Sequence, residues 1–333
     1  MRNDNFLLFI KYFVFFGVFS VFFLNQLEVL ISGQGDVRNY RYLIEIKMLG
    51  AQKSEPFLKF LIILINYLTN SPRIILLTIN TLTFLLIIYI SQLFVKKNVT
   101  KEIYLILMMG LSVALLSSLQ TTMRQGLGYI FFFYFVYSII YNYKFSYTII
   151  FLILASLCHN IFFILGGTIL LLNYLDLYKI NYKKLKIFFV FTLLFLISNF
   201  LLNDFMHLSQ KIFSRQTYIN INNEYDSGLR IDFIGTNMFV IMFIIYLKNF
   251  NFNKLNHSDK VFINILLSSI IAYIFFRDLP YIDRFFYASW IFYPIILVLY
   301  IENKLLFFIS FIFVLLNYLY KPVRYEFYLY NIL

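Results

Sequence analysis

The segment between Glu102 and Lys144 constrains the fold more than any other part of the chain, because it is predominantly apolar and contains a single charge, Arg124. A helix needs about 20 apolar residues to cross the hydrocarbon core of a bilayer. The segment therefore predicts two membrane-spanning helices, with Arg124 at the bend between them. A charge at the bilayer centre costs roughly 2.5 to 3.5 kcal/mol on insertion scales. Arg124 is thus either functional or a side chain that reaches the headgroups and anchors a helix end.

The composition extends this interpretation to the whole chain. It is 61% hydrophobic and 13% charged, with a mean hydropathy of +0.78, whereas a soluble domain is about 45–50% apolar and about 25% charged. We predict an all-α polytopic integral membrane protein that forms one domain over residues 1–333, because no polar stretch is long enough for a separate soluble domain. The first apolar run, 6–31, lacks the small-residue cleavage site of a secretory signal and is predicted to be a signal anchor.

Eleven of the apolar runs are predicted to be membrane-spanning helices. They are 6–31, 74–95, 103–119, 127–141, 145–158, 160–175, 187–203, 233–247, 261–276, 285–301 and 305–319. The long run 145–175 is divided at Cys158-His159-Asn160, because both of its flanks are rich in lysine and like flanks require an even number of crossings. One further run, 57–68, is too short to cross. Its polar residues share one helical face, which indicates an interfacial amphipathic helix with Ser54 as its N-cap.

The positive charges predict the orientation in the membrane. The loops 96–102, 176–186 and 248–260 are short and rich in lysine, and such loops stay on the cytoplasmic side. This rule places the N-terminus inside, the C-terminus outside, and the two long segments 32–73 and 204–232 on the outer side. The net charge of +12 is therefore explained by membrane topology, and nucleic acid is not a predicted partner.

Arginine and lysine are separated in this topology. Nine of the ten arginines lie on the outer side, whereas thirteen of the eighteen lysines lie inside or at the inner boundary. The planar guanidinium can bind phosphate or carboxylate through two parallel hydrogen bonds, which lysine cannot do. The pattern favours an anionic ligand at the outer face; the alternative is that long outer loops pair arginines with their own acidic residues. The middles of the spans hold almost no ionisable residue, which argues against an ion-coupled transporter.

Two outer residues are candidates for a catalytic base that activates a hydroxyl group. His159 lies at the outer tip of a predicted helical hairpin, and an unperturbed imidazole titrates near neutral pH. Asp36 lies in the loop after the first span, and a carboxylate near the membrane surface can take a proton from a sugar hydroxyl. The alternatives are a histidine that caps a helix end and a turn with solvated charges. We rank His159 first, because an unperturbed carboxylate is the weaker base at neutral pH.

The candidate anion-binding residues are arginines of the outer side: Arg38, Arg124, Arg230, Arg277 and Arg284. The turn between Arg277 and Arg284 also contains two aspartates, so these arginines either clamp a pyrophosphate or neutralise their own neighbours. Arg230 lies near the end of the loop 204–232, which is long enough to cover a site. The three histidines lack the spacing of metal ligands, so no metal site is predicted.

Four short motifs occur in order along the first half of the chain. They are Gly33-x-x-Asp36-x-x-x-Tyr40 after the first span, Glu55-Pro56-Phe57 at the amphipathic helix, Arg124-Gln125-Gly126 at the start of a span, and Ala155-Ser156-x-x-His159. With these motifs the chain resembles the Wzy-type polysaccharide polymerases, and in particular their EpsG-like branch. The second half is similar to this family in layout, with a long outer loop followed by Asp283-Arg284-Phe285 and an aromatic C-terminus.

The resemblance implies a glycosyltransferase with a GT-C-like, lipid-facing fold in the cytoplasmic membrane of a bacterium. It would transfer a growing glycan from undecaprenyl pyrophosphate to the non-reducing end of another lipid-linked repeat unit on the outer face, in O-antigen, capsule or exopolysaccharide assembly. The arginines would bind the pyrophosphate, His159 or Asp36 would activate the acceptor, and no cofactor or metal is implied. The implied ligands are membrane lipid and the undecaprenyl-pyrophosphate-linked oligosaccharide, and a chain-length regulator is left open as a protein partner.

Two other functions are weighed against this one. A flippase or exporter of lipid-linked glycans requires cations along a path through the spans, and here they stop at the outer boundary. A membrane O-acyltransferase requires a histidine deep in a tunnel with access to an inner acyl donor, whereas His159 is predicted to lie at the outer surface. The sequence therefore favours the polymerase.

Overall fold

The structure, a computed structural model, describes residues 2–32, 41, 44, 56–95, 98–120, 123–174, 231–276 and 284–300. Every regular element in these residues is a helix, which agrees with the predicted all-α class. The chain divides into two compact units, one of residues 1–163 and 291–333 and the other of residues 164–290. The single domain expected from the sequence stays a prediction.

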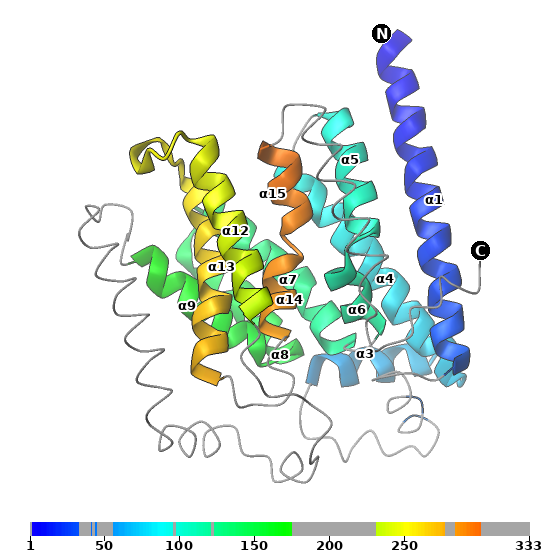
Figure 1. The fold of residues 1–333 in the computed structure, drawn as a ribbon. Helices are drawn as coiled ribbons and strands as arrows, with labels where there is room; N and C mark the ends of the chain where they lie inside the picture. The colour runs from blue at the N-terminus through cyan, green and yellow to red at the C-terminus, as the bar shows by residue number, and fades with distance from the viewer. Residues whose placement is uncertain are drawn as a thin grey trace. The chain divides into compact units, whose positions relative to one another are not determined.

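The first unit contains most of the described helices. They are α1 (Arg2–Ser32), α3 (Pro56–Asn66), α4 (Pro72–Gln92), α5 (Val99–Gly110), α6 (Val113–Gln120), α7 (Met123–Ile140), α8 (Phe145–Cys158) and α15 (Tyr293–Tyr300) (Figure 1). A short 3-10 turn, Leu93–Val95, continues α4. The helix α9 (Ile161–Tyr174) begins in the first unit and continues into the second, which also contains α12 (Ile231–Leu247), α13 (His257–Phe276) and α14 (Arg284–Trp290).

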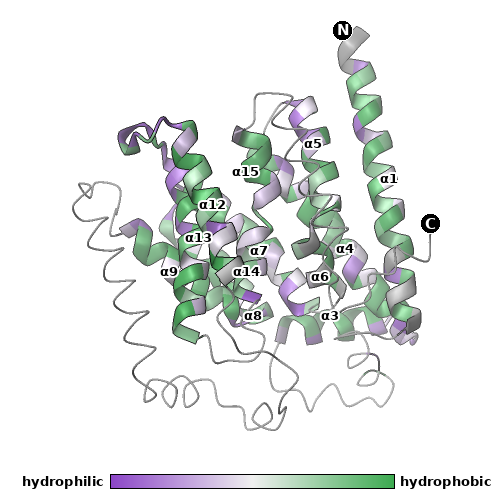
Figure 2. Cartoon of the chain, in the orientation of Figure 1, coloured by the Kyte–Doolittle hydropathy of each residue, from purple (hydrophilic) through white to green (hydrophobic). Residues whose placement is uncertain are grey.

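Three of the described helical segments are long and apolar enough to cross a membrane: Asn5–Leu24, Pro72–Val95 and His257–Phe276. Large apolar side chains of α1 are exposed, such as Phe9 at 66% and Phe13 at 70%. Figure 2 shows hydrophobic residues along the helix bodies and hydrophilic residues gathered mainly near helix ends. Contiguous exposed phenylalanines indicate contact with lipid rather than water. The chain is therefore a helical membrane protein, and the number of eleven spans stays a prediction.

The helices α1 and α4 pack in opposite directions. Phe22 stacks on Phe84 with ring centroids 4.0 Å apart, and one turn further along α1, Gln26 Oε1 accepts a hydrogen bond of 2.8 Å from Asn80 Nδ2. Four residues forward in α1 thus correspond to four residues back in α4. The Gln26–Asn80 bond is fully buried in an apolar setting, where such a bond joins helices that would otherwise gain little from association in lipid.

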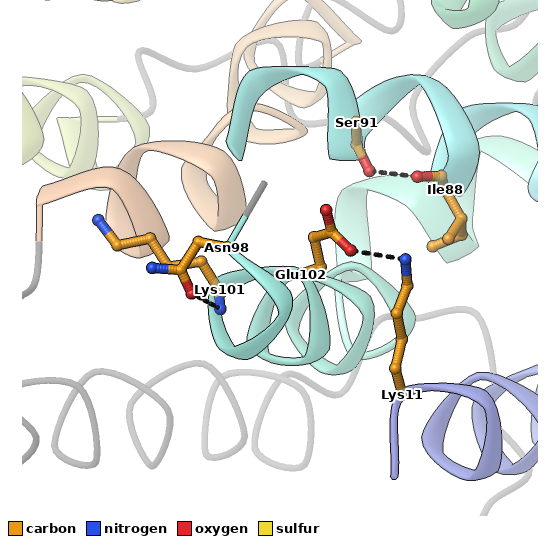
Figure 3. Close-up of polar contacts among 6 residues, drawn as sticks. All are labelled: Lys11, Ile88, Ser91, Asn98, Lys101 and Glu102. Atoms are coloured by element: carbon orange, nitrogen blue, oxygen red, sulfur yellow. Dashed lines mark hydrogen bonds and ion pairs between the residues drawn. The ribbon is translucent and has the colours of Figure 1, made fainter. Parts of the chain in front are cut away.

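The helices α1 and α5, in contrast, run in the same direction. Between the third turn of α1 and the first turn of α5, Lys11 Nζ forms an ion pair of 2.6 Å with Glu102 Oε2 (Figure 3). About two turns further along each helix, Val18 lies against the backbone of Gly110, where the absence of a side chain lets the helices approach closely. Asn98 caps α5 by accepting a hydrogen bond of 3.0 Å from the Lys101 backbone N–H. These directions agree with the predicted alternation of the first three crossings.

The predicted span 103–119 is not one helix. The structure divides it into α5 and α6 at Leu111-Ser112, which corrects the sequence prediction. Ser112 caps the second helix: its carbonyl oxygen accepts from the Leu116 N–H at 3.0 Å, and its hydroxyl accepts from the Leu115 N–H at 3.4 Å. Serine is favoured here because its oxygen atoms satisfy backbone donors that the first turn of a helix leaves unpaired. Hydropathy does not detect this break, since the flanking residues are apolar.

The predicted span 285–301 is also divided, into α14 and α15, with the break at Ile291-Phe292. Pro294 lies in the first turn of α15, where proline is tolerated because the missing N–H would have no intrahelical acceptor. In the middle of a continuous helix the same residue would remove one hydrogen bond and clash with the preceding turn. Within the first unit, Lys101 Nζ donates to the Leu299 carbonyl oxygen at 3.3 Å, so α15 ends beside the start of α5.

The predicted amphipathic helix is present as α3, although its proposed N-cap, Ser54, lies outside the described residues. Leu58 and Ile62, one turn apart, are 1% and 0% exposed, whereas Phe60 and Leu64 are exposed. The helix packs against α4 and α8 and lies crosswise to α1 and α5 in Figure 1. The helix itself is confirmed, and its location at the membrane interface stays a prediction.

A buried polar cluster joins three helices of the second unit. Asn237 of α12 accepts a hydrogen bond of 2.9 Å from the indole N–H of Trp290 in α14. Its amide nitrogen lies 2.6 Å from the hydroxyl of Ser269 in α13 and 3.2 Å from that of Ser289 in α14. Because all four side chains are at least nine-tenths buried, these bonds fix α14, and with it the first residue of that helix, Arg284, on the other two helices.

Candidate functional site

The antiparallel pair α7 and α8 brings two predicted site residues to the same end of the first unit. The hydroxyl groups of Ser138 and Thr148 form a hydrogen bond of 2.9 Å, and Tyr134 stacks on Phe151 with ring centroids 5.2 Å apart. Later residues of α8 therefore lie beside earlier residues of α7. The C-terminus of α8, where His159 follows, lies beside the N-terminal turns of α7, where Arg124 is located.

Arg124 lies in the first turn of α7 and not in the bend between helices. The sequence predicted a helix from 127, whereas α7 begins at Met123, which corrects the earlier boundary by one turn. Arg124 is half-buried, and the next residue, Gln125, is fully buried. A long cation at the start of a membrane helix can extend its charge toward the polar boundary while its stem stays in the apolar region.

A buried hydrogen-bond network holds the first turns of α7 against α6. The Tyr129 hydroxyl accepts a hydrogen bond of 2.9 Å from Gln125 Nε2 and lies 3.1 Å from the Ser118 hydroxyl. Ser118 in turn donates to the Ala114 carbonyl oxygen at 2.6 Å. None of the three polar side chains is exposed. Since polar groups buried at this depth are costly unless they are paired, the network fixes the turn that carries Arg124.

His159 ends α8 and connects it to α9. Its backbone N–H donates to the Ala155 carbonyl oxygen at 3.0 Å, and its Nδ1 accepts from the Ile161 backbone N–H at 3.3 Å. The half-buried ring thus caps the start of α9, which is the structural alternative weighed from the sequence. When Nδ1 accepts a hydrogen bond, the neutral ring carries its proton on Nε2. In this tautomer Nε2 can donate a hydrogen bond while Nδ1 caps α9, whereas accepting a proton at Nε2 requires the contact with Ile161 to break.

The aromatic ring of Phe162 links His159 to the network on α7. Phe162 is fully buried, lies edge-on to Tyr129 at 5.5 Å, and lies edge-on to the His159 ring at 6.4 Å between centroids. The turn of Arg124 and the ring of His159 are therefore joined through two intervening aromatic side chains. This arrangement was not anticipated from the sequence. The spacing of Gln125 and Tyr129 at i and i+4 on one helix was a signal for part of it.

The described structure does not place the other predicted site residues relative to this cluster. Asp36, Arg38, Arg230 and Arg277 lie outside the described residues. Arg284 is the first residue of α14 and half-buried, in the second unit. Among the described residues no group of three or more histidine, cysteine, aspartate or glutamate side chains has the geometry to hold a metal ion.

Comparison with known proteins gives one result. The model of the EpsG family matches residues 11–332, which is nearly the whole chain and includes all of the site residues named above. No curated protein and no solved structure matches the chain. The family match confirms the resemblance inferred from the four motifs and supports a glycosyltransferase-like polymerase activity. The chain belongs to the EpsG family and is a membrane protein of the polysaccharide polymerase type.

Proposed function

We propose that this protein joins undecaprenyl-pyrophosphate-linked repeat units into a polysaccharide on the outer face of the bacterial cytoplasmic membrane. The product would be O-antigen, capsule or exopolysaccharide. The family match supports the reaction class. The proposed site is supported by the antiparallel pairing of α7 and α8. Because of this pairing, the guanidinium-bearing residue Arg124 and the imidazole-bearing residue His159 belong to the same end of the helix pair.

The reaction replaces one bond to the anomeric carbon by another. The acceptor hydroxyl of one repeat unit attacks that carbon of the donor glycan, the bond to the pyrophosphate breaks, and the hydroxyl proton is transferred to a base. Such a step requires a more nucleophilic oxygen and a stabilised leaving group. We assign the base to His159, with Asp36 as the second candidate. The pyrophosphate is assigned to Arg124, with Arg38, Arg230, Arg277 and Arg284 as further substrate contacts expected from the sequence.

The hydrogen bond at His159 Nδ1 defines what the base role requires. With the neutral ring protonated on Nε2, that nitrogen is a hydrogen-bond donor, suited to an anionic oxygen. To accept the acceptor's proton at Nε2, the ring must first carry its proton on Nδ1 and therefore give up the contact with the Ile161 N–H, which at 3.3 Å is at the long end of hydrogen-bond distances. We propose that substrate binding accompanies this exchange.

The apolar body of the protein suits a substrate with a polyprenyl chain. Exposed phenylalanine, leucine and isoleucine side chains cover the described helices α1, α4 and α8, and a lipid tail can lie along them while the pyrophosphate stays at the polar boundary. We propose a GT-C-like arrangement with eleven crossings and a reaction that uses neither cofactor nor metal. A chain-length regulator is a proposed protein partner.

The function is tested with the purified protein in lipid nanodiscs. The substrate is the lipid-linked repeat unit that accumulates in cells of the native strain from which this gene has been deleted. We expect a ladder of longer glycans on a gel, together with release of undecaprenyl pyrophosphate, and only single repeat units from boiled protein. If the deletion strain retains its repeat units in the inner leaflet and the purified protein makes no ladder, the protein is a flippase and the proposal is wrong.

The orientation of the chain is tested by cysteine labelling in intact cells. In a Cys158→Ala background, a cysteine at Asn98 or Asn256 should resist a membrane-impermeant maleimide, because both positions lie in loops predicted to be inside. A cysteine at Asn222 should react. Permeabilised cells provide the control, in which all three positions should react. Labelling of Asn98 in intact cells, with none at Asn222, would reverse the orientation and place His159 on the cytoplasmic side.

A further inference from the structure

The ring of Phe162 occupies a space that exists only because residue 128 has no side chain. If Gly128 carried a Cβ atom, its three nearest neighbours would all be atoms of the Phe162 ring, with Cδ2 at 2.7 Å, Cζ at 3.0 Å and Cε2 closer still. These separations are shorter than a carbon–carbon contact, which is about 3.5–4.0 Å. The ring therefore rests directly on the backbone of α7.

The remaining faces of the ring are also held by α7. Phe162 packs against Phe132 with ring centroids 4.9 Å apart and edge-on against Tyr129 at 5.5 Å, and the side chain is 0% exposed. Its backbone N–H donates to the His159 carbonyl oxygen at 3.1 Å. The residue is thus fixed on α7 through its side chain and fixed to His159 through its backbone.

We infer that Gly128 and Phe162 are positioning residues that set the location of His159 relative to the first turn of α7. The inference rests on the proposed function, because it supposes that His159 acts on the substrate bound near Arg124. His159 is anchored on one side by the Ile161 N–H at Nδ1 and on the other by the Phe162 ring. A methyl group at position 128 would displace that ring, and with it the turn that connects α8 to α9.

The glycine at 128 has no other evident requirement. It lies within the helix α7, where alanine is normally favoured over glycine by about 1 kcal/mol. Gly128→Ala should therefore stabilise the helix itself, and any loss must come from the displaced ring. Gly167 in α9 provides the matched control, because a Cβ atom there would meet no atom within 4 Å. Gly167→Ala brings the same gain in helix propensity without a collision.

The test compares Gly128→Ala, Phe162→Leu, the double variant and Gly167→Ala as purified proteins in nanodiscs, with repeat units from the deletion strain as substrate. We expect Gly128→Ala and Phe162→Leu each to lower kcat by about 10- to 100-fold with KM for the donor unchanged, since a misplacement of about 1 Å can cost this much. The double variant should have a higher kcat than either single variant, because leucine at position 162 leaves room for the methyl group at position 128. Gly167→Ala should match the wild type.

The outcomes separate this inference from the proposed function. If kcat of both single variants stays within twofold of the wild type while His159→Ala is inactive, the positioning role is wrong and the catalytic role of His159 stands. If His159→Ala has the wild-type rate, the positioning role and the catalytic role of His159 are both wrong. Losses confined to Tm and yield, with unchanged kcat of the folded fraction, would also overturn the inference. If Gly128→Ala is not recovered from membranes, Phe162→Leu decides alone, with loss of kcat supporting the inference and an unchanged kcat overturning it.

Discussion

His159→Ala should reduce chain elongation by about 100- to 10,000-fold, the usual cost of losing a general base or acid. Cells that carry this variant at wild-type protein levels should therefore display single repeat units, visible on a gel of surface polysaccharide, in place of the long ladder. Asp36→Asn in the same strain should leave the ladder intact, because the base is assigned to His159. The reverse pattern would transfer the base to Asp36.

Two further substitutions separate the roles that the structure allows for the imidazole. His159→Asn keeps a side-chain acceptor for the Ile161 N–H and preserves the cap at the start of α9, but it removes Nε2. His159→Gln keeps a side-chain N–H donor but cannot take a proton. Both should be as inactive as His159→Ala if the residue is a base. A full ladder from His159→Asn would leave the histidine with only its capping role, and a ladder from His159→Gln would indicate hydrogen-bond donation.

Arg124→Lys should lower kcat/KM for the lipid-linked donor by about 10- to 100-fold although it conserves the charge. Lysine cannot form the two parallel hydrogen bonds that a guanidinium makes with a phosphate, and one hydrogen bond to a charged group contributes about 1.5 to 3 kcal/mol. The measurement is the initial rate of glycan transfer by purified protein in nanodiscs. The unfolding temperature of the variant is measured alongside, because the substitution leaves the buried side chains of Gln125, Tyr129 and Ser118 in place.

Arg73→Lys is the control for Arg124→Lys. Arg73 is the second residue of α4, as Arg124 is of α7, and it is exposed. An arginine that only anchors a helix end in the headgroups can be replaced by lysine, because both side chains reach the polar boundary. Arg73→Lys should therefore have the wild-type rate. Equal, unchanged rates for both variants would mean that Arg124 is also an anchor.

The sequence alone predicted those features that depend on hydropathy and short-range signals. The all-α membrane class, the helix α3, and the division of 145–175 at His159 were all predicted, because apolar length, helical periodicity and flanking charges report directly on burial in a bilayer. The family was also recognised from short motifs such as Arg124-Gln125-Gly126, and the family match confirms it. The roles assigned to the individual site residues stay predictions.

The helix breaks at Ser112 and before Pro294 were not predicted. An apolar run is equally hydrophobic whether it forms one helix or two, so hydropathy cannot reveal a change of backbone direction inside it. The break at Ser112 depends on a hydroxyl group that caps the second helix, and the break before Pro294 depends on where the proline falls in the new helix. Both are local effects that tertiary packing must also permit.

Tertiary structure alone decided which side chains meet. The Gln26–Asn80 hydrogen bond, the Lys11–Glu102 ion pair and the contact of Phe162 with Gly128 each join residues from different helices. The sequence shows the helices but not their neighbours or their depth relative to one another, because between membrane helices packing and hydrogen bonds, rather than hydrophobicity, select the partner. For the same reason the sequence could name His159 and Arg124 separately, whereas only the pairing of α7 with α8 brought them to one end of the same unit.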